Sequence, residues 1–357
     1  MKKIVISGGG TGGHIFPALA IAKALEEKYV DCQILFIGAK NRMEMEQIPR
    51  AGYCIEGLDI RGFNRQKLFS NFSLPFILIK SLIKARKILK IFQPNAVIGV
   101  GGYVSAAALW AASQLRIPYI IQEQNSFPGI TNRILSKRAK VICVAYNGME
   151  KWFKKDKIVL CGNPVRKEIV NIVQNYEQDR IQPKEILILG GSLGALSINE
   201  SIVNNLQWFV SSNIHLIWQT GRSFFSKAKE ITKKLGEKID VYEFINEMDK
   251  AYTQADIIVS RAGALAIAEL AIVGKPTILI PSPNVAEDHQ TKNALSLSAQ
   301  NAAILIKDSH ASRQLIPTLE TLINNPVLCD TLSKNIEKLS IKDADKKIVE
   351  QVAKYIK

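Results

Sequence analysis

Short apolar runs alternate with longer amphipathic segments along the chain. The runs are rich in Ile, Val and Leu, and they lie at residues 4–7, 33–37, 96–100, 118–121, 158–160 and 185–189. Apolar strands that alternate with helices are typical of parallel sheets whose two faces are both covered by helices. The pattern therefore predicts an α/β protein built on doubly wound parallel sheets.

A glycine-rich loop follows the first apolar run. Five glycines lie within residues 8–13, and a helix is expected from His14 to Glu27. Backbone amides can approach an anion closely in such a loop, and the helix N-terminus adds about half a positive charge. The dinucleotide pattern G-x-G-x-x-G is present, but the next strand ends in Gly38-Ala39-Lys40 without the acidic residue that nicotinamide enzymes carry there. We therefore expect a phosphorylated ligand here and not a nicotinamide dinucleotide.

The same arrangement returns in the second half, after a turn-rich segment at 161–167. Residues 185–189 lead into the loop Gly190-Gly191-Ser192-Leu193-Gly194, and a third strand-to-helix turn lies at 257–269. Two halves of similar length predict two Rossmann-like domains that face each other across a cleft, a common place for ligands. The expected boundaries are 1–162 for the first domain, 163–340 for the second, and 341–357 for a C-terminal helix that packs back on the first domain.

The charge is distributed unevenly between the two halves. The chain has 357 residues and a formal net charge of +15, and the whole excess of Lys and Arg lies within residues 1–166. A basic half points to an anionic partner, either nucleic acid or acidic lipid. The five cysteines are scattered without a C-x-x-C pair, and the four histidines lack ligand spacing. With no signal peptide visible, this favours a reducing cytoplasm and argues against a zinc site or a disulfide framework.

Residues 75–92 predict an unusual helix. At 100° per residue its expected core stripe is Ile77, Leu78, Leu82, Ala85, Ile88, Leu89 and Phe92. The other face mixes cations with large apolar side chains, as helices at anionic bilayer surfaces do. We expect the membrane contacts to be Phe76, Ile79, Lys80, Ile83, Lys84 and Lys87. The alternatives are a solvated basic face with a few stray apolar residues, or a face that packs against a neighbouring loop. The preceding stretch, 57–72, is expected to be a basic loop.

Polar residues follow two further strands of the first half. Gly101-Gly102-Tyr103 comes after residues 96–100, and Gln122-Glu123-Gln124-Asn125 comes after residues 118–121. The carboxyl ends of parallel strands are where open α/β sheets bind ligands. Glu123 is therefore a candidate for acid–base chemistry, or else an acid that caps a helix or braces a loop. His14 has a similar alternative, because a histidine at a helix start can simply cap or pack.

Several motifs occur in one order and at domain-scale spacing, namely Gly9-Gly10-Thr11-Gly12-Gly13-His14-x-x-Pro17, Gly101-Gly102-Tyr103-Val104-Ser105, Glu123-Gln124-Asn125, Gly162-Asn163-Pro164-Val165-Arg166, Gly190-Gly191-Ser192 and Arg261-x-Gly263-Ala264-Leu265. Together they resemble the MurG family of peptidoglycan N-acetylglucosaminyltransferases over roughly residues 1 to 300. The resemblance implies a GT-B fold and an inverting transfer of N-acetylglucosamine from UDP-N-acetylglucosamine to undecaprenyl-diphosphate-N-acetylmuramoyl-pentapeptide (lipid I), which gives lipid II. It also implies a peripheral enzyme on the cytoplasmic face of the plasma membrane.

The resemblance also assigns residues to roles. The base is His14 or Glu123, and His14 is preferred because an ordinary histidine pKa of about 6.5 suits neutral pH. The implied donor-binding residues are Thr11, Gly12, Gly13, Asn125, Arg166, Ser192, Ile245, Ala264, Leu265, Ala266, Ile267, Ala268, Glu269 and Gln290. The implied acceptor side comprises Gly10, Tyr103 and Asn132.

No metal or cofactor is expected, because helix dipoles, Arg and polar donors can stabilise a departing diphosphate. The expected partners are UDP-N-acetylglucosamine, lipid I, an anionic phospholipid surface and other cell-wall synthesis proteins, with no nucleic acid. Three positions depart from the usual family pattern, and they are Gln122, Leu193 and His289. The competing hypotheses are a UDP-sugar epimerase on the same fold and a non-enzymatic basic protein that binds membranes or nucleic acid.

Overall fold

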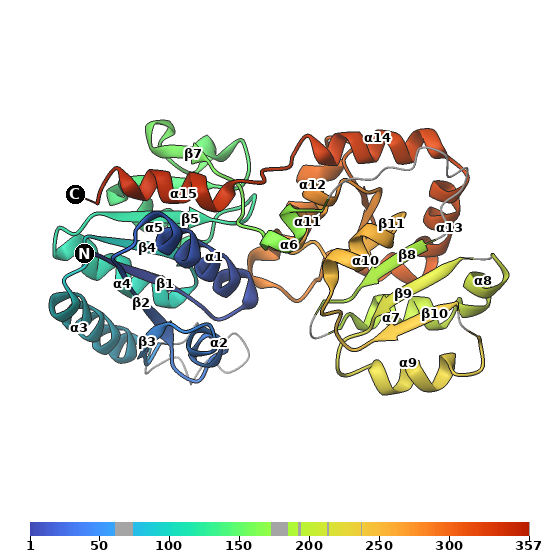
Figure 1. Cartoon of the computed structure of the whole chain (residues 1–357), viewed down its shortest axis with the longest axis horizontal. Coiled ribbons are helices and arrows are strands. Elements are labelled where there is room, and N and C mark those ends of the chain that lie inside the picture. Colours follow the sequence, from blue (N-terminus) through green and yellow to red (C-terminus); the bar gives the residue numbers. More distant parts are fainter. Residues whose placement is uncertain (61–73, 173–184, 192–193, 213, 237, 357) are drawn as a thin grey trace. The chain divides into compact units, whose positions relative to one another are not determined.

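The computed structural model describes residues 1–60, 74–172, 185–191, 194–212, 214–236 and 238–356. The chain divides into two compact units (Figure 1). Unit 1 comprises Met1–Val165 together with Asp343–Lys357, and unit 2 comprises Arg166–Lys342. Each unit has its own parallel sheet and its own hydrophobic core.

The sheet of unit 1 has the strand order β3-β2-β1-β4-β5-β6-β7, and every ladder in it is parallel. Its strands are β1 (Lys2–Gly8), β2 (Cys32–Ala39), β3 (Cys54–Leu58), β4 (Ala96–Gly101), β5 (Tyr119–Glu123), β6 (Val141–Val144) and β7 (Ile158–Leu160). The central strands are buried on both faces and read as continuous apolar runs, which is why the sequence pattern predicts them well.

Helices cover both faces of this sheet. They are α1 (Gly12–Lys28), α2 (Glu44–Arg50), α3 (Leu74–Phe92), α4 (Tyr103–Gln114), α5 (Ile130–Leu135), α15 (Ala344–Ala353) and the 3₁₀ turns η2 (Ser136–Arg138), η3 (Met149–Lys151) and η4 (Lys155–Lys157). One core lies under α1 and α15, and it includes Ile348, Val349 and Val352 of α15. In Figure 1, α15 runs alongside α1, which it contacts. The other core lies under α3 and α4.

Unit 2 repeats the plan with the strand order β10-β9-β8-β11-β12-β13, again with all ladders parallel. Its strands are β8 (Glu185–Leu189), β9 (His215–Gln219), β10 (Ile239–Tyr242), β11 (Ile257–Ser260), β12 (Thr277–Leu279) and β13 (Ile304–Leu305). Its helices are α6 (Lys167–Val170), α7 (Leu196–Val203), α8 (Leu206–Ser211), α9 (Phe225–Thr232), α10 (Met248–Gln254), α11 (Ala264–Val273), α12 (His289–Ser298), α13 (Ala311–Ile323) and α14 (Pro326–Glu337), with the 3₁₀ turns η5 (Ala286–Asp288) and η6 (Asp308–His310). Trp218 and Phe209 are among the large side chains of its core.

Some local predictions are wrong. The helical pattern places Leu78 in the core stripe of α3, but this residue is exposed in the structure. The buried residues of α3 begin only at Ser81, so the N-terminal part of the helix, with Leu78, does not pack on the core. Gly57 and Leu58 belong to β3 and not to a loop, while residues 61–73 lie outside the described part. Glu123 is the last residue of β5 and does not follow the strand. Among the described helices, none combines the length and the apolar content needed to cross a bilayer.

Candidate active site

The predicted site residues of unit 1 gather at the carboxyl edge of its sheet. β1, β4 and β5 are neighbours in the sheet, and all three run in the same direction. Their carboxyl ends carry the glycine loop with His14, the turn at Gly101-Gly102, and Glu123. The parallel arrangement therefore brings together three motifs that lie far apart in the sequence.

The ring of His14 is fixed in orientation by the loop that precedes it. Its Nδ1 lies 2.9 Å from the carbonyl oxygen of Gly9 and 3.4 Å from Oγ1 of Thr11. A carbonyl oxygen can only accept, so Nδ1 carries the hydrogen and the neutral ring has its lone pair on Nε2. Nε2 lies over Gly101, where an added Cβ would stand 2.8 Å away. His14 thus presents a basic nitrogen at the sheet edge, with Gly101 providing the space.

The first glycine loop already holds a carboxylate. The Glu44 side chain, which is fully buried, accepts hydrogen bonds from the backbone N of Gly10 at 3.0 and 3.1 Å and from that of Ala39 at 3.0 Å. The sequence pattern gives no sign of this role for Glu44. It is the first residue of a short helix, and nothing in the pattern links it to a loop 34 residues earlier.

Glu123 braces the loop that follows β5. Its carboxylate is buried and accepts from the backbone N of Asn125 and Gly129 and from the side-chain amides of Asn125 and Asn132 at 2.8 to 3.4 Å. Burial raises the pKa of Glu123, although these hydrogen bonds act in the opposite direction. A carboxylate engaged on both oxygens and shielded from solvent is better suited to hold the loop than to take a proton from a substrate.

A buried amide network lies beside Glu123. Nε2 of Gln122 donates to Oδ1 of Asn163 at 3.0 Å, and Nδ2 of Asn163 donates to the carbonyl of Gln124 at 2.9 Å. Nε2 of Gln124 donates to the carbonyl of Val100 at 2.6 Å and contacts Oε1 of Gln122. Gln122, one of the family departures, is therefore a structural link between β5 and the segment after β7.

The remaining predicted residues of unit 1 differ in exposure. Thr11 is the exposed N-cap of α1, and Gly12 and Gly13 are the first two residues of that helix. Tyr103 begins α4 with its side chain 59% exposed, and Asn132 is buried on α5 against Glu123. Of the three acceptor-side residues, Gly10 and Tyr103 are thus exposed at this edge.

The second glycine loop is only partly described. Gly190 and Gly191 follow β8, Ser192 and its neighbour Leu193 lie outside the described residues, and α7 begins at Leu196. α11 begins directly after β11, with Gly263 as its N-cap and no acidic residue in its first turn. Its N-terminal residues Ala264, Leu265 and Ala266 are half-buried, with Ile267 buried and Ala268 half-buried behind them. The N-terminus of a helix that has no acidic residue in its first turn favours binding of an anionic group.

Two predicted donor residues bind each other. Nε and Nη2 of Arg166 both donate to Oε1 of Glu269, at 3.1 and 3.0 Å. The other oxygen of Glu269 accepts from the hydroxyl of Tyr252 at 3.0 Å. Burial, followed by the charge of Glu269, raises the pKa of Tyr252, so its hydroxyl stays protonated and remains a donor.

The other two donor candidates of unit 2 have internal partners. The backbone N of Ile245 donates to Oε1 of Gln219 at 3.0 Å. Oε1 of Gln290 accepts from the backbone N of Ser282 at 2.8 Å. Gln290 lies in the first turn of α12, which starts at His289.

Arg261, the first residue of the motif that leads into α11, anchors the segment after β12. Its Nη1 donates to the carbonyl oxygens of Ile280 and Pro281 at 3.0 and 3.2 Å and pairs with Asp308, while Nη2 donates to Oγ of Ser197 at 3.2 Å. Both charged side chains are largely buried. Arg261 therefore ties the ends of two central strands to η6 and α7.

The exposed face of α3 is apolar and basic. Phe76, Ile79 and Ile83 are 77%, 55% and 65% exposed, and Lys80 and Lys87 lie exposed among them. Lys84 differs, because its Nζ donates to the carbonyl of Gly57 at 2.7 Å. A shallow hollow beside this helix is lined by Asp59, Lys80, Ser81, Ile83, Lys84 and Lys87.

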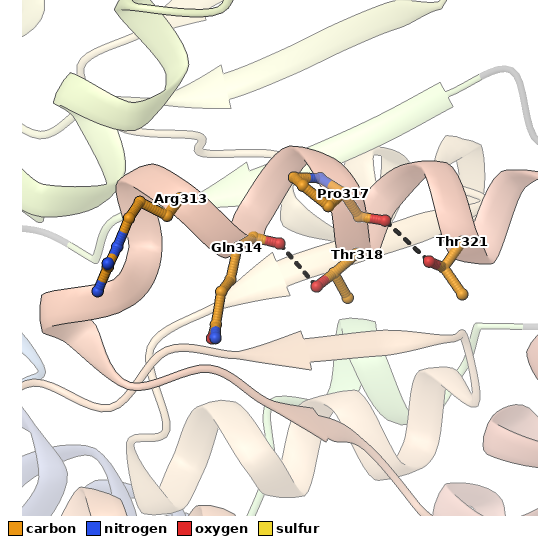
Figure 2. Close-up of a pocket in the computed structure, with 5 residues that line it drawn as sticks. All are labelled: Arg313, Gln314, Pro317, Thr318 and Thr321. Carbon is orange, nitrogen blue, oxygen red and sulfur yellow. Dashed lines mark hydrogen bonds between the residues drawn. The ribbon is translucent and has the colours of Figure 1, made fainter.

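A hollow on α13 of unit 2 carries little chemistry. It is lined by Arg313, Gln314, Pro317, Thr318 and Thr321 along one side of the helix (Figure 2). Both threonine hydroxyls donate to carbonyls of their own helix, those of Gln314 and Pro317. Within the described residues, no three His, Cys, Asp or Glu side chains are grouped as metal ligands.

Two family models match the chain. The glycosyltransferase family 28 N-terminal domain matches residues 4–144, and the glycosyltransferase family 28 C-terminal domain matches residues 185–351. The chain is also similar to curated proteins named UDP-N-acetylglucosamine–N-acetylmuramyl-(pentapeptide) pyrophosphoryl-undecaprenol N-acetylglucosamine transferase. Identity is 47% with the one from Flavobacterium psychrophilum and 49% with the one from Cytophaga hutchinsonii, over 99% of this chain and 98% and 97% of those proteins.

Solved structures give the same picture. The crystal structure of Acinetobacter baumannii MurG is 30% identical, with a TM-score of 0.82, and the match covers 99% of this chain and 100% of that chain. A UDP-GlcNAc 2-epimerase from Neisseria meningitidis is 18% identical with a TM-score of 0.67, covering 99% of this chain and 100% of that chain. At that identity the epimerase shares the fold alone.

Proposed function

This chain belongs to the MurG family within glycosyltransferase family 28, and from that premise we propose the reaction that it performs. It transfers N-acetylglucosamine from UDP-N-acetylglucosamine to lipid I, and the product is lipid II. The observation that carries this conclusion is the 47–49% identity, along nearly the whole chain, to proteins named for that transfer. The two parallel-sheet units form the GT-B fold that the family uses. An epimerase is not favoured, because the likeness to epimerases is one of fold.

His14 is the general base in this proposal. A base must receive the proton of the acceptor hydroxyl as that oxygen attacks the anomeric carbon. The hydrogen bond from Nδ1 to Gly9 leaves the lone pair of the neutral ring on Nε2, at the same sheet edge as the exposed Gly10 and Tyr103. Glu123 then has a positioning role, because its carboxylate holds the loop that carries Asn125 and Asn132. Inversion follows from direct attack by the hydroxyl on the face opposite the leaving group.

Unit 2 binds the donor in this proposal. The start of α11, from Ala264 to Ala268, faces the diphosphate, which the helix N-terminus stabilises as negative charge develops on it. Glu269 accepts from the ribose hydroxyls, and Arg166 approaches the diphosphate once it leaves Glu269. Ile245 contacts uracil through its backbone, and Gln290 contacts the sugar. Ser192, although outside the described residues, belongs to the second glycine loop on the diphosphate side. These groups supply the stabilisation that a metal would otherwise give.

Lipid I places the reaction at a membrane surface. The exposed Phe76, Ile79 and Ile83 enter the acyl boundary in this proposal, and Lys80 and Lys87 meet lipid phosphates. Lys84 contributes from the hollow at the base of this surface, with its ammonium bound to Gly57. The enzyme is then peripheral and acts on the cytoplasmic face, where UDP-N-acetylglucosamine is available.

The test is transfer of labelled N-acetylglucosamine from its UDP donor to a lipid I analogue, with a chelator present, for wild type and His14→Ala. The proposal expects transfer by wild type, and a variant that binds UDP normally but fails to transfer. Near-normal transfer by His14→Ala would remove the base assignment. Release of free sugar or its epimerisation by wild type, without transfer, would overturn the reaction itself. His310→Ala, in unit 2, is the matched control.

A further inference from the structure

We propose that Glu44 is a positioning residue for His14, acting as an internal anion that sets the glycine loop and thereby the nitrogen on which His14 is basic. This inference rests on the proposed function, in which His14 is the base. The sequence pattern predicted that the loop would cradle a phosphorylated ligand. In the structure, the carboxylate of Glu44 already accepts a hydrogen bond from one of the backbone amides of that loop, the amide of Gly10.

The carboxylate of Glu44 fits the loop closely. Both of its oxygens accept from the backbone N of Gly10, and Oε1 also accepts from that of Ala39 at the end of β2. A Cβ added at Gly9 would stand 1.9 Å from Oε1, and one added at Gly38 would stand 2.7 Å from Cγ. The glycines at 9 and 38 therefore make room for this one side chain, and the Gly10 amide is taken by it.

The loop transmits this position to His14. Gly9 lies between the Glu44 carboxylate and the histidine, because its carbonyl oxygen receives the hydrogen of Nδ1 at 2.9 Å. While that carbonyl is held, the neutral imidazole keeps its hydrogen on Nδ1 and its lone pair on Nε2. If the loop relaxes, the other tautomer becomes accessible, in which Nε2 carries the hydrogen and cannot accept a proton. Glu44 thus acts on the reaction without touching a substrate.

The experiment compares Glu44→Ala and Glu44→Gln with wild type in the full-length protein. Gln keeps a carbonyl oxygen for the Gly10 and Ala39 amides but brings an NH₂ group against the Gly10 amide. Glu46→Gln is the matched control, because Glu46 lies on the same helix with its side chain exposed and paired with Arg50. Gly9→Ala is a further variant, which displaces the carboxylate while Glu44 itself is retained.

Two readouts are taken. The first is the ¹⁵N spectrum of the His14 ring, which reports the tautomer without any substrate. The second is steady-state transfer, with kcat and the KM for UDP-N-acetylglucosamine measured separately. We expect a mixed tautomer and a fall in kcat of about 10- to 100-fold in Glu44→Ala and Gly9→Ala, with a smaller fall in Glu44→Gln and an unchanged KM for the donor. Glu46→Gln should match wild type.

Several outcomes would overturn the proposal. One is a folded Glu44→Gln or Gly9→Ala variant that keeps the Nδ1–H tautomer and full kcat. A second is a loss of kcat in the variants while the His14 spectrum stays as in wild type. If wild type itself transfers nothing, the proposed function fails, while the ¹⁵N spectrum still decides whether Glu44 sets the tautomer. If Glu44→Ala does not fold, the same two measurements on Glu44→Gln and Gly9→Ala test the proposal.

Discussion

Arg166 and Glu269 form a two-point ion pair in which Nε and Nη2 of the arginine donate to a single carboxylate oxygen. They lie 103 residues apart, and in the proposed mechanism each has a different partner on the donor. Donor binding then exchanges one internal pair for two external ones. The carboxylate turns to the ribose, and the guanidinium turns to the diphosphate.

This exchange predicts opposite effects on two probes. In Glu269→Gln, uridine, which has the ribose but no diphosphate, should bind about tenfold more weakly, because the ribose loses a charged acceptor worth about 1.5 kcal/mol. Inorganic pyrophosphate should bind more tightly, because Arg166 is no longer held by an opposite charge. Calorimetric titration measures both. Glu247→Gln, which breaks the exposed pair with Lys250, is the control and should change neither. Equal weakening of both probes would contradict the exchange.

The exposed face of α3 predicts a loss of membrane binding on substitution. Ile83→Glu should lower the partition constant onto vesicles with anionic phospholipid by about 10- to 100-fold, because an apolar side chain that enters the acyl boundary contributes roughly 1.5–3 kcal/mol. Vesicle sedimentation measures this, and added salt should weaken binding of wild type. Val30→Glu replaces a fully exposed apolar residue outside this face and should bind as wild type does. Equal loss in both variants would argue against a specific membrane face.

The Arg261–Asp308 pair predicts a stability effect within unit 2. Arg261→Ala leaves a largely buried carboxylate without its cation, and this should lower the free energy of unfolding by about 3 kcal/mol. Urea unfolding followed by the fluorescence of the buried Trp218 measures the change. Adding Asp308→Asn should recover part of the loss, because the unpaired charge is then removed. A double variant no more stable than the single one would place the effect elsewhere.

Glu123 predicts a pH-dependent contribution to stability. Burial raises its pKa above the ordinary value of 4.5, so the native state binds the proton more tightly than the unfolded chain. The stabilisation from protonation is therefore complete below about pH 4.5 and is lost as the pH rises through the native pKa. Glu123→Gln does not titrate. The free energy of unfolding of wild type, relative to that of this variant, should decrease as pH rises. Unfolding can be measured by the fluorescence of Trp152, which packs on Phe127 in the adjoining loop. An advantage that grows with pH would contradict the prediction.

Buried strands were the part of the fold that the sequence predicted best. β8 begins and ends where the apolar pattern places it, because a strand buried in a parallel sheet is a continuous apolar run bounded by turn residues. β7 also has the predicted bounds, although it is a partly exposed edge strand. The edge strand β3 was missed, since Cys54–Leu58 mixes apolar, acidic and glycine positions. Leu78 was misplaced because helical periodicity shows which face a residue occupies but not where the neighbouring element stops.

The candidate site also has features that the sequence predicted and features that it did not. The motifs located the glycine loops, His14 and Glu123, because each of these features is part of a short contiguous stretch of sequence. They did not show that Glu44 binds Gly10 or that Arg166 binds Glu269, because the fold alone creates contacts across 34 and 103 residues. The roles given to Thr11, Asn125, Ile245 and Gln290 remain predictions, and each of these residues has an internal partner in the structure.

The placement of α15 has a consequence for biosynthesis. Ile348, Val349 and Val352 complete a core of unit 1, yet they are translated after every residue of unit 2. While the ribosome is still adding them, the surface of α1 that they will cover stays open to solvent and to chaperones. The unit that comes second along the chain is thus the first that can finish folding during synthesis, and the unit that begins the chain finishes last.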